Sequence, residues 1–89
     1  MSVAQRYMMA TSRLMPAVTE KNPHLKDQVG QCIFDFVVQN VGADLAPKIT
    51  GMLIALPCAE IRHFMSLYEN LQAKSIEARE HLLKTIDEK

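Results

Sequence analysis

The stretch DLAPKITGMLIALP, residues 44–57, carries the strongest helical pattern in the sequence. Its apolar residues recur every three or four positions, which is the spacing of one buried helix face. This face consists of Leu45, Ile49, Met52, Leu53 and Leu56. Asp44 can cap the first turn, Pro47 lies within that turn, where a missing N–H costs little, and Pro57 stops the helix. We therefore predict a helix between Asp44 and Pro57.

A longer helix is predicted just before this stretch. It begins at Asn22-Pro23, because Asn caps free N–H groups and Pro suits the first helical position. Its core face, at helical spacing, is formed by Leu25, Val29, Ile33, Phe36, Val37 and Asn40. Gly42 is expected to end this helix in a left-handed cap.

Two further helices are predicted after Pro57. The first covers residues 59–65, and its apolar side consists of Ile61, Phe64 and Met65. Ser66 and Glu69 have the spacing of a capping box, so they predict the start of the longest helix. The apolar side of that helix consists of Leu67, Leu71, Ala78, Leu82 and Ile86, and charged residues occupy its other side.

The N-terminal segment leaves two alternatives open. Residues 3–15 form a weak amphipathic stretch that is either a first helix or a partly ordered lead-in, and residues 16–21 have the pattern of a connector. We therefore divide the chain into a lead-in segment, residues 1–21, and a domain, residues 22–89. Four or five helices with short connections predict a small all-α bundle.

Composition narrows the possible functions. Ten Lys or Arg residues balance ten Asp or Glu residues, and a module without a basic excess is a poor candidate for binding nucleic acid. No apolar run reaches the roughly 18–20 residues of a membrane span. Cys32 and Cys58 lack CxxC spacing, which favours free thiols in a reducing compartment over a disulfide or a zinc site. We expect an intracellular helical module.

The residue types that carry catalysis are not grouped in this sequence. His24, His63 and His81 fall on three separate predicted helices, so we expect no metal site. Neither cysteine has a base beside it, and there is no glycine-rich phosphate loop. We therefore expect no enzyme activity and no cofactor.

Two glycines inside the predicted helices point to a binding surface. Gly30 lies one turn before Phe34, and a glycine within a helix costs about 1 kcal/mol relative to alanine. Gly51 lies inside the next helix in the same way. If the two helices pack side by side, the glycines and Phe34 define a slot for an aromatic side chain of a partner. The alternative is that the glycines only let the two helices approach closely.

The segment KITGMLIAL, residues 48–56, resembles the KITGMLLE signature of the MLLE (PABC) family, the C-terminal peptide-binding domains of cytoplasmic poly(A)-binding proteins. Three other segments, VGQCIF (29–34), EIRHF (60–64) and ENLQAK (69–74), are similar to further family segments and follow in the same order. The sequence departs from the family at Ile54-Ala55, where the signature has Leu-Glu, and at Gln31, where the family has Glu. These departures bear on ligand preference.

The resemblance implies four or five helices in a right-handed superhelix that bind short PABP-interacting motifs. Such motifs are linear segments of translation, deadenylation and mRNA-decay factors, and each anchors itself through a Phe and a Leu. The resemblance implies that the pocket for the ligand Phe is formed by Gly30, Gln31, Phe34, Lys48 and Gly51. It implies that the pocket for the ligand Leu is formed by Met52, Leu53, Ala78 and Leu82.

The resemblance also implies a setting for the domain. We expect a cytoplasmic, monomeric adaptor whose parent protein binds poly(A) RNA through other domains. One alternative is an MLLE module of a HECT-type ubiquitin ligase, in which catalysis lies elsewhere in the chain. Another is a helical homo-oligomerisation module, in which a second copy fills the groove beside Phe34.

Overall fold

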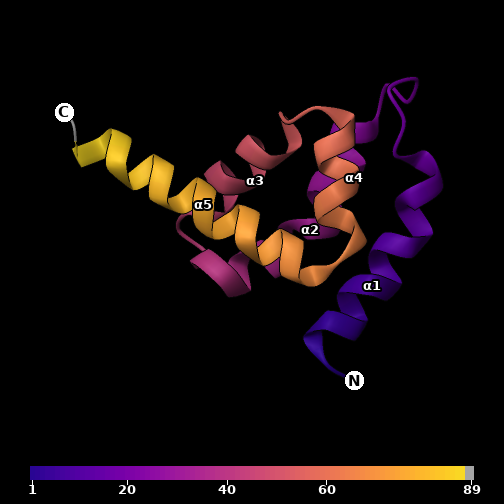
Figure 1. The fold of residues 1–89 in the computed structure, drawn as a ribbon, viewed down its shortest axis with the longest axis horizontal. Helices are drawn as coiled ribbons and strands as arrows, with labels where there is room; N and C mark the ends of the chain where they lie inside the picture. Colours follow the sequence, from indigo (N-terminus) through magenta and orange to yellow (C-terminus); the bar gives the residue numbers. More distant parts are fainter. Residues whose placement is uncertain (88–89) are drawn as a thin grey trace.

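The computed structural model describes residues 1–87, which form five α-helices and one short 3-10 turn without any strand (Figure 1). In chain order the elements are α1 (Val3–Leu14), the 3-10 turn (Met15–Ala17), α2 (Leu25–Val41), α3 (Ala46–Ile54), α4 (Cys58–Ser66) and α5 (Tyr68–Asp87). The predicted all-α bundle is therefore confirmed. The right-handed sense of its superhelix stays a prediction.

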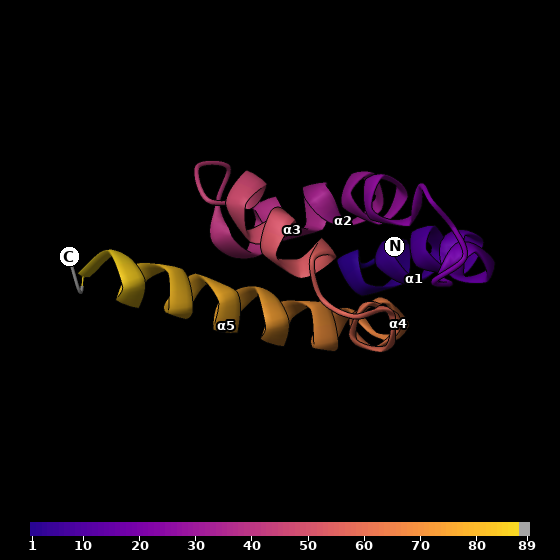
Figure 2. The same cartoon turned by 90° about the horizontal axis from the view of Figure 1, so that it is seen from above.

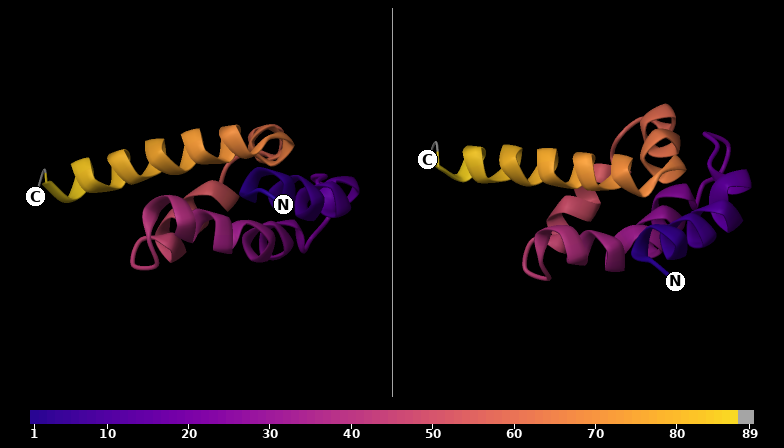
Figure 3. Two further views of the ribbon diagram at one scale, coloured as in Figure 1. Left: turned by 90° about the horizontal axis from the view of Figure 1, so that it is seen from below. Right: turned by 60° about the horizontal axis from the view of Figure 1, so that its bottom comes forward.

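The helix order places α3 between two longer helices. α3 packs against α2 on one side and against α5 on the other, while α1 and α4 close the opposite end of the bundle. The C-terminal half of α5 extends beyond the other helices (Figures 2 and 3). α3 therefore has one interface with each of the two longest helices, α2 and α5.

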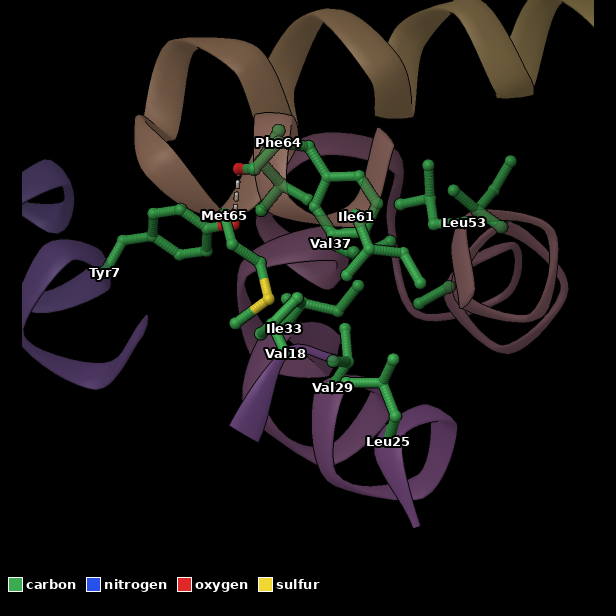
Figure 4. Packing of buried hydrophobic residues seen from close by; sticks show 13 residues of the cluster. Tyr7, Val18, Leu25, Val29, Ile33, Val37, Leu53, Ile61, Phe64 and Met65 are labelled. Carbon is green, nitrogen blue, oxygen red and sulfur yellow. Dashed lines mark hydrogen bonds between the residues drawn. The ribbon is translucent and has the colours of Figure 1, made fainter. Parts of the chain in front are cut away.

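The core gathers apolar side chains from all five helices (Figure 4). The predicted core face of α4 is confirmed, since Ile61, Phe64 and Met65 are buried. In α2, Leu25, Val29, Ile33 and Val37 are buried as predicted, whereas Phe36 and Asn40 are only partly buried. In α3 only two of the five predicted residues, Ile49 and Leu53, are fully buried; Ala46 and Thr50 take the other buried positions. In α5, Leu71 is buried as predicted and Ser75 is buried unexpectedly. Leu67, predicted for the same apolar side, lies just before α5 and is half-exposed. The predicted burial of the Ile86 side chain stays a prediction, because the described side chains end at Thr85.

The N-terminal segment is a helix whose side chains belong to this core. Ser2 and Gln5 form a capping box at the start of α1. The Tyr7 side chain is fully buried and donates a hydrogen bond of 2.8 Å from its hydroxyl to the carbonyl oxygen of Phe64 in α4 (Figure 4). Its ring packs edge-on against Phe36, with centroids 4.9 Å apart, and lies near Tyr68. The first of the two alternatives for this segment, a helix, is the one observed. The domain boundary at residues 21 and 22 stays a prediction.

Several predicted helix ends are wrong, because the capping side chains bind elsewhere. α2 begins at Leu25 rather than at Asn22, since Asn22 accepts a hydrogen bond from the N–H of His24 and donates to the carbonyl of Ala17. Gly42 ends α2 with the expected positive φ of 89°, but its ψ of 158° is extended rather than left-handed helical.

The predicted starts of α3 and α5 are corrected in the same way. No side chain caps α3, so the role predicted for Asp44 is wrong, although Pro47 does lie in the first turn. Ser66 donates its hydroxyl back to the carbonyl of Arg62 and so closes α4 instead of opening α5. The predicted capping box with Glu69 is therefore wrong.

Candidate functional site

A first hollow of about 500 Å³ lies between α2 and α3. Its lining consists of Lys26, Asp27, Gly30, Gln31, Phe34 and Asp35 from α2 and of Pro47, Thr50 and Ile54 from α3. The structure therefore brings three of the predicted Phe-pocket residues, Gly30, Gln31 and Phe34, together at one site. It opens to solvent beside Phe34, a large apolar residue that is 36% exposed.

The glycine in this hollow leaves room rather than allowing a close helix contact. A Cβ atom built at Gly30 meets its nearest neighbours, Thr50 and Ile54, at 3.8–3.9 Å, which is ordinary van der Waals separation. α2 and α3 are therefore far enough apart at this point for a larger residue than glycine. The space that the missing side chain leaves belongs to the hollow, so close packing alone does not account for Gly30.

Lys48 and Gly51 do not line this hollow. Both are exposed, and a Cβ atom built at Gly51 has no neighbour within 4 Å. The prediction that both glycines and Phe34 define one slot is therefore wrong for Gly51. At 100° per residue, Lys48, Gly51 and Ala55 share the solvent face of α3.

The rim of the first hollow is charged in a way that sequence reasoning missed. Asp27 and Asp35 lie two turns apart on α2, on either side of Gln31, and Lys26 adjoins the first of them. Positions 27, 31 and 35 follow one another at i+4 spacing, so this stripe was readable from the sequence. Two carboxylates and one ammonium group give the rim a mixed, slightly acidic character.

A second hollow of about 250 Å³ lies on the other side of α3, against α5. It is lined by Met52 and Leu53 from α3, by Leu56 from the turn after α3, and by Lys74, Glu77, Ala78 and His81 from α5. Three of the four predicted Leu-pocket residues, Met52, Leu53 and Ala78, thus lie together. The fourth, Leu82, is partly buried against the core and is not part of the lining.

The polar side of the second hollow comes from α5 alone. Lys74, Glu77 and His81 follow one another at i+3 and i+4 spacing, which is the signal that could have identified them. Lys74 also forms an ion pair with Glu60 of α4, with 3.4 Å between nitrogen and oxygen. The apolar wall comes mainly from α3 and the turn after it, so this hollow has one apolar side and one charged side.

The titratable groups with shifted pKa lie away from both hollows. Burial is the main cause that raises the pKa of the Tyr7 hydroxyl above its usual range, and burial also raises the pKa of the Cys32 thiol. A protonated thiol is a poor nucleophile. Within residues 1–87, no group of three or more His, Cys, Asp or Glu side chains is placed to hold a metal ion. In the same part of the chain no helix is both long and apolar enough to cross a membrane.

Two open, largely apolar hollows on either side of one short helix suit the side chains of an extended peptide, and they define a small all-α peptide-binding module. The family model of the MLLE domain matches residues 19–82, which is more than half of the chain, and the chain belongs to that family. Domains of this family are peptide-binding modules for protein–protein interaction, not catalytic domains. Comparisons with curated proteins and with solved structures found no match.

The space beside Gly30 leads to a prediction about its substitution. Gly30→Leu is expected to fill the first hollow and to weaken binding of a Phe-anchored peptide at least about tenfold, because the guest ring loses its site. Gly30→Ala meets only ordinary contacts, so it is expected to raise the free energy of unfolding by about 1 kcal/mol. Urea unfolding and calorimetric titration measure the two effects.

The matched control for this prediction is Gln39→Leu, which places the same side chain on an exposed position of α2 outside the hollow. It is expected to bind peptide like the wild type. Undiminished affinity in folded Gly30→Leu protein would rule out the first hollow as the site of the aromatic anchor.

Proposed function

We propose that this domain is the C-terminal adaptor module of a cytoplasmic poly(A)-binding protein and that it recruits partners through short PABP-interacting motifs. The motif places its Phe in the hollow between α2 and α3 and its Leu in the hollow between α3 and α5. Its sources are translation, deadenylation and mRNA-decay factors. The parent protein holds poly(A) RNA through other domains, and this module binds protein.

The observation that carries the proposal is the pair of hollows on opposite sides of α3. Burial of one Phe and one Leu contributes about 2–3 kcal/mol each, and a few backbone hydrogen bonds add about 1 kcal/mol apiece. Ordering a flexible peptide removes several kcal/mol of this gain. The net binding free energy is therefore clearly smaller than the sum of these gains, which suits a partner that exchanges.

Calorimetric titration with a synthetic PABP-interacting motif tests the proposal. The peptide is expected to bind one-to-one, and replacing either its Phe or its Leu by Ala is expected to weaken binding by about tenfold or more. A peptide whose binding is insensitive to both replacements contradicts the proposal. Sedimentation with and without peptide separates the adaptor, which stays monomeric, from a module that pairs with a second copy.

A substitution on α5 identifies the leucine site within the same experiment. Ala78→Leu fills the second hollow and is expected to weaken the Leu-bearing peptide about tenfold. Its effect on the peptide with Ala in place of Leu is expected to be small, because that peptide leaves the hollow empty. Ala73→Leu makes the same change on the same helix at an exposed position outside the hollow, and it is expected to bind both peptides like the wild type. Equal loss with both peptides would place the Leu elsewhere.

The identity of the parent protein rests on a different observation. RNA-recognition motifs upstream of this segment are expected in a poly(A)-binding protein, whereas a HECT-type ligase domain in the same chain supports the alternative. Both parents leave the peptide-binding role of this module unchanged.

A further inference from the structure

The six methionines of the chain differ sharply in their surroundings. Met65 is fully buried in the core, and Met15 is partly buried against it. Met1, Met8 and Met9 are exposed at the N-terminus and on α1, where they line a hollow of their own. Met52 alone lies in the hollow between α3 and α5, where its side chain is partly exposed.

We infer that peroxide oxidises Met52 and that the oxidised side chain weakens the binding of a leucine anchor in the second hollow. This inference rests on the proposed function of that hollow. A partly exposed side chain in an open hollow is accessible to a molecule as small as hydrogen peroxide. A buried methionine such as Met65 lacks that access.

The chemistry is a two-electron oxygen transfer from peroxide to the thioether. A lone pair of the Met52 sulfur attacks one peroxide oxygen, the O–O bond breaks, and a new S–O bond forms. The departing hydroxide and the proton released from the transferred oxygen leave as water. Sulfur is oxidised, peroxide is reduced, and the side chain becomes a sulfoxide, which reductases of the cell can reverse.

The position of Met52 turns this change into a loss of leucine binding. Met52, Leu53, Leu56 and Ala78 form the apolar part of the hollow, and Lys74, Glu77 and His81 form its polar part. A sulfoxide places a strong hydrogen-bond acceptor in the apolar part, where water solvates it while the hollow is empty. A guest Leu displaces that water from the apolar part, where Leu53, Leu56 and Ala78 have no side-chain donor to replace it, and this weakens binding.

The test compares wild-type protein and Met52→Leu after treatment with hydrogen peroxide. Each protein is titrated with a PABP-interacting motif peptide and with the same peptide carrying Ala in place of its Leu. Oxidised wild type is expected to bind the Leu peptide about tenfold more weakly than the untreated protein and to show little change with the Ala peptide. Mass spectrometry of proteolytic fragments is expected to find one added oxygen on Met52.

Met52→Leu is the matched control because it keeps Met1, Met8, Met9, Met15 and Met65. Its affinity is expected to be insensitive to peroxide, and thermal melting checks that treated proteins stay folded. The inference is overturned if Met52 stays unmodified, if oxidised wild type keeps its affinity, or if Met52→Leu loses affinity equally. Failure of untreated wild type to bind the Leu peptide overturns the proposed function itself, and with it the inference.

Discussion

Phe34→Ala is expected to weaken binding of a Phe-anchored peptide by about 2–3 kcal/mol, or roughly 30- to 150-fold. The Phe34 ring forms the open wall of the hollow between α2 and α3, and its removal takes away both apolar contact and an aromatic partner for the guest ring. The ring is 36% exposed and lies outside the core cluster, so the variant is expected to fold. Calorimetric titration gives the affinity, and circular dichroism gives the fold.

Ile76→Ala is the control for this variant. Ile76 is an apolar side chain of similar exposure, 40%, and it lines neither hollow. Its truncation is expected to leave the affinity for peptide unchanged, which separates the role of the hollow from a general loss of surface hydrophobicity. A folded Phe34→Ala protein with wild-type affinity would remove Phe34 from the binding site.

Tyr7→Ala is expected to lower the free energy of unfolding by about 3–5 kcal/mol, a large part of the roughly 5–15 kcal/mol that holds a typical domain folded. The side chain is fully buried, its hydroxyl satisfies the carbonyl of Phe64, and its ring packs against Phe36 and Tyr68. Truncation leaves a cavity and an unpaired carbonyl together. Urea denaturation followed by circular dichroism measures the loss.

Two further variants divide this effect into its parts. Tyr7→Phe keeps the ring and is expected to cost about 1–2 kcal/mol, because it removes only the hydrogen bond to Phe64. Met8→Ala truncates an exposed neighbour on the same helix and is expected to stay within about 0.5 kcal/mol of wild type. If Tyr7→Ala also changed the free energy of unfolding by no more than about 0.5 kcal/mol, α1 would be dispensable for stability, although its side chains pack into the core.

Features that depend on local spacing were predictable from the sequence, and features that depend on the approach of distant segments were not. The core face of α2 is set by its own period, so Val29, Ile33 and Val37 were identified correctly. Tyr7 was missed because it is one aromatic residue in a weak amphipathic stretch. Its hydrogen-bond partner Phe64 lies 57 positions along the chain.

The helix caps show a second limit, because their competing partners lie only two to five positions away in the sequence. The side chains of Asn22 and Ser66 have the right chemistry for a cap, yet each finds another partner within reach. Asn22 joins the turn before α2 to Ala17, and Ser66 bonds back into its own helix. A capping residue therefore identifies the neighbourhood of a helix end, but competition for its hydrogen bonds decides the residue at which the helix begins.

The residues of the candidate site also divide into those that local spacing predicts and those that depend on how two helices pack. Gly30 and Phe34 were found because both lie on one flank of α2, one turn apart. Pro47, Thr50 and Ile54 complete that hollow from α3, and their part in it depends on how α3 sits against α2. No single-helix pattern contains that register, so the facing wall was missed while the near wall was identified.

The position of the two hollows on opposite flanks of α3 sets a minimum span for any ligand that occupies both. A helix with its side chains is about 10–12 Å thick, and an extended chain advances about 3.3 Å per residue, so roughly four residues must bridge the two anchors. The linking residues would cross the exposed side of α3. There Gly51 and Ala55, one turn apart, are small residues that leave room for a peptide backbone. A motif whose two anchor residues are adjacent in sequence can therefore occupy only one hollow at a time. Only a motif with more widely spaced anchors can occupy both hollows at once.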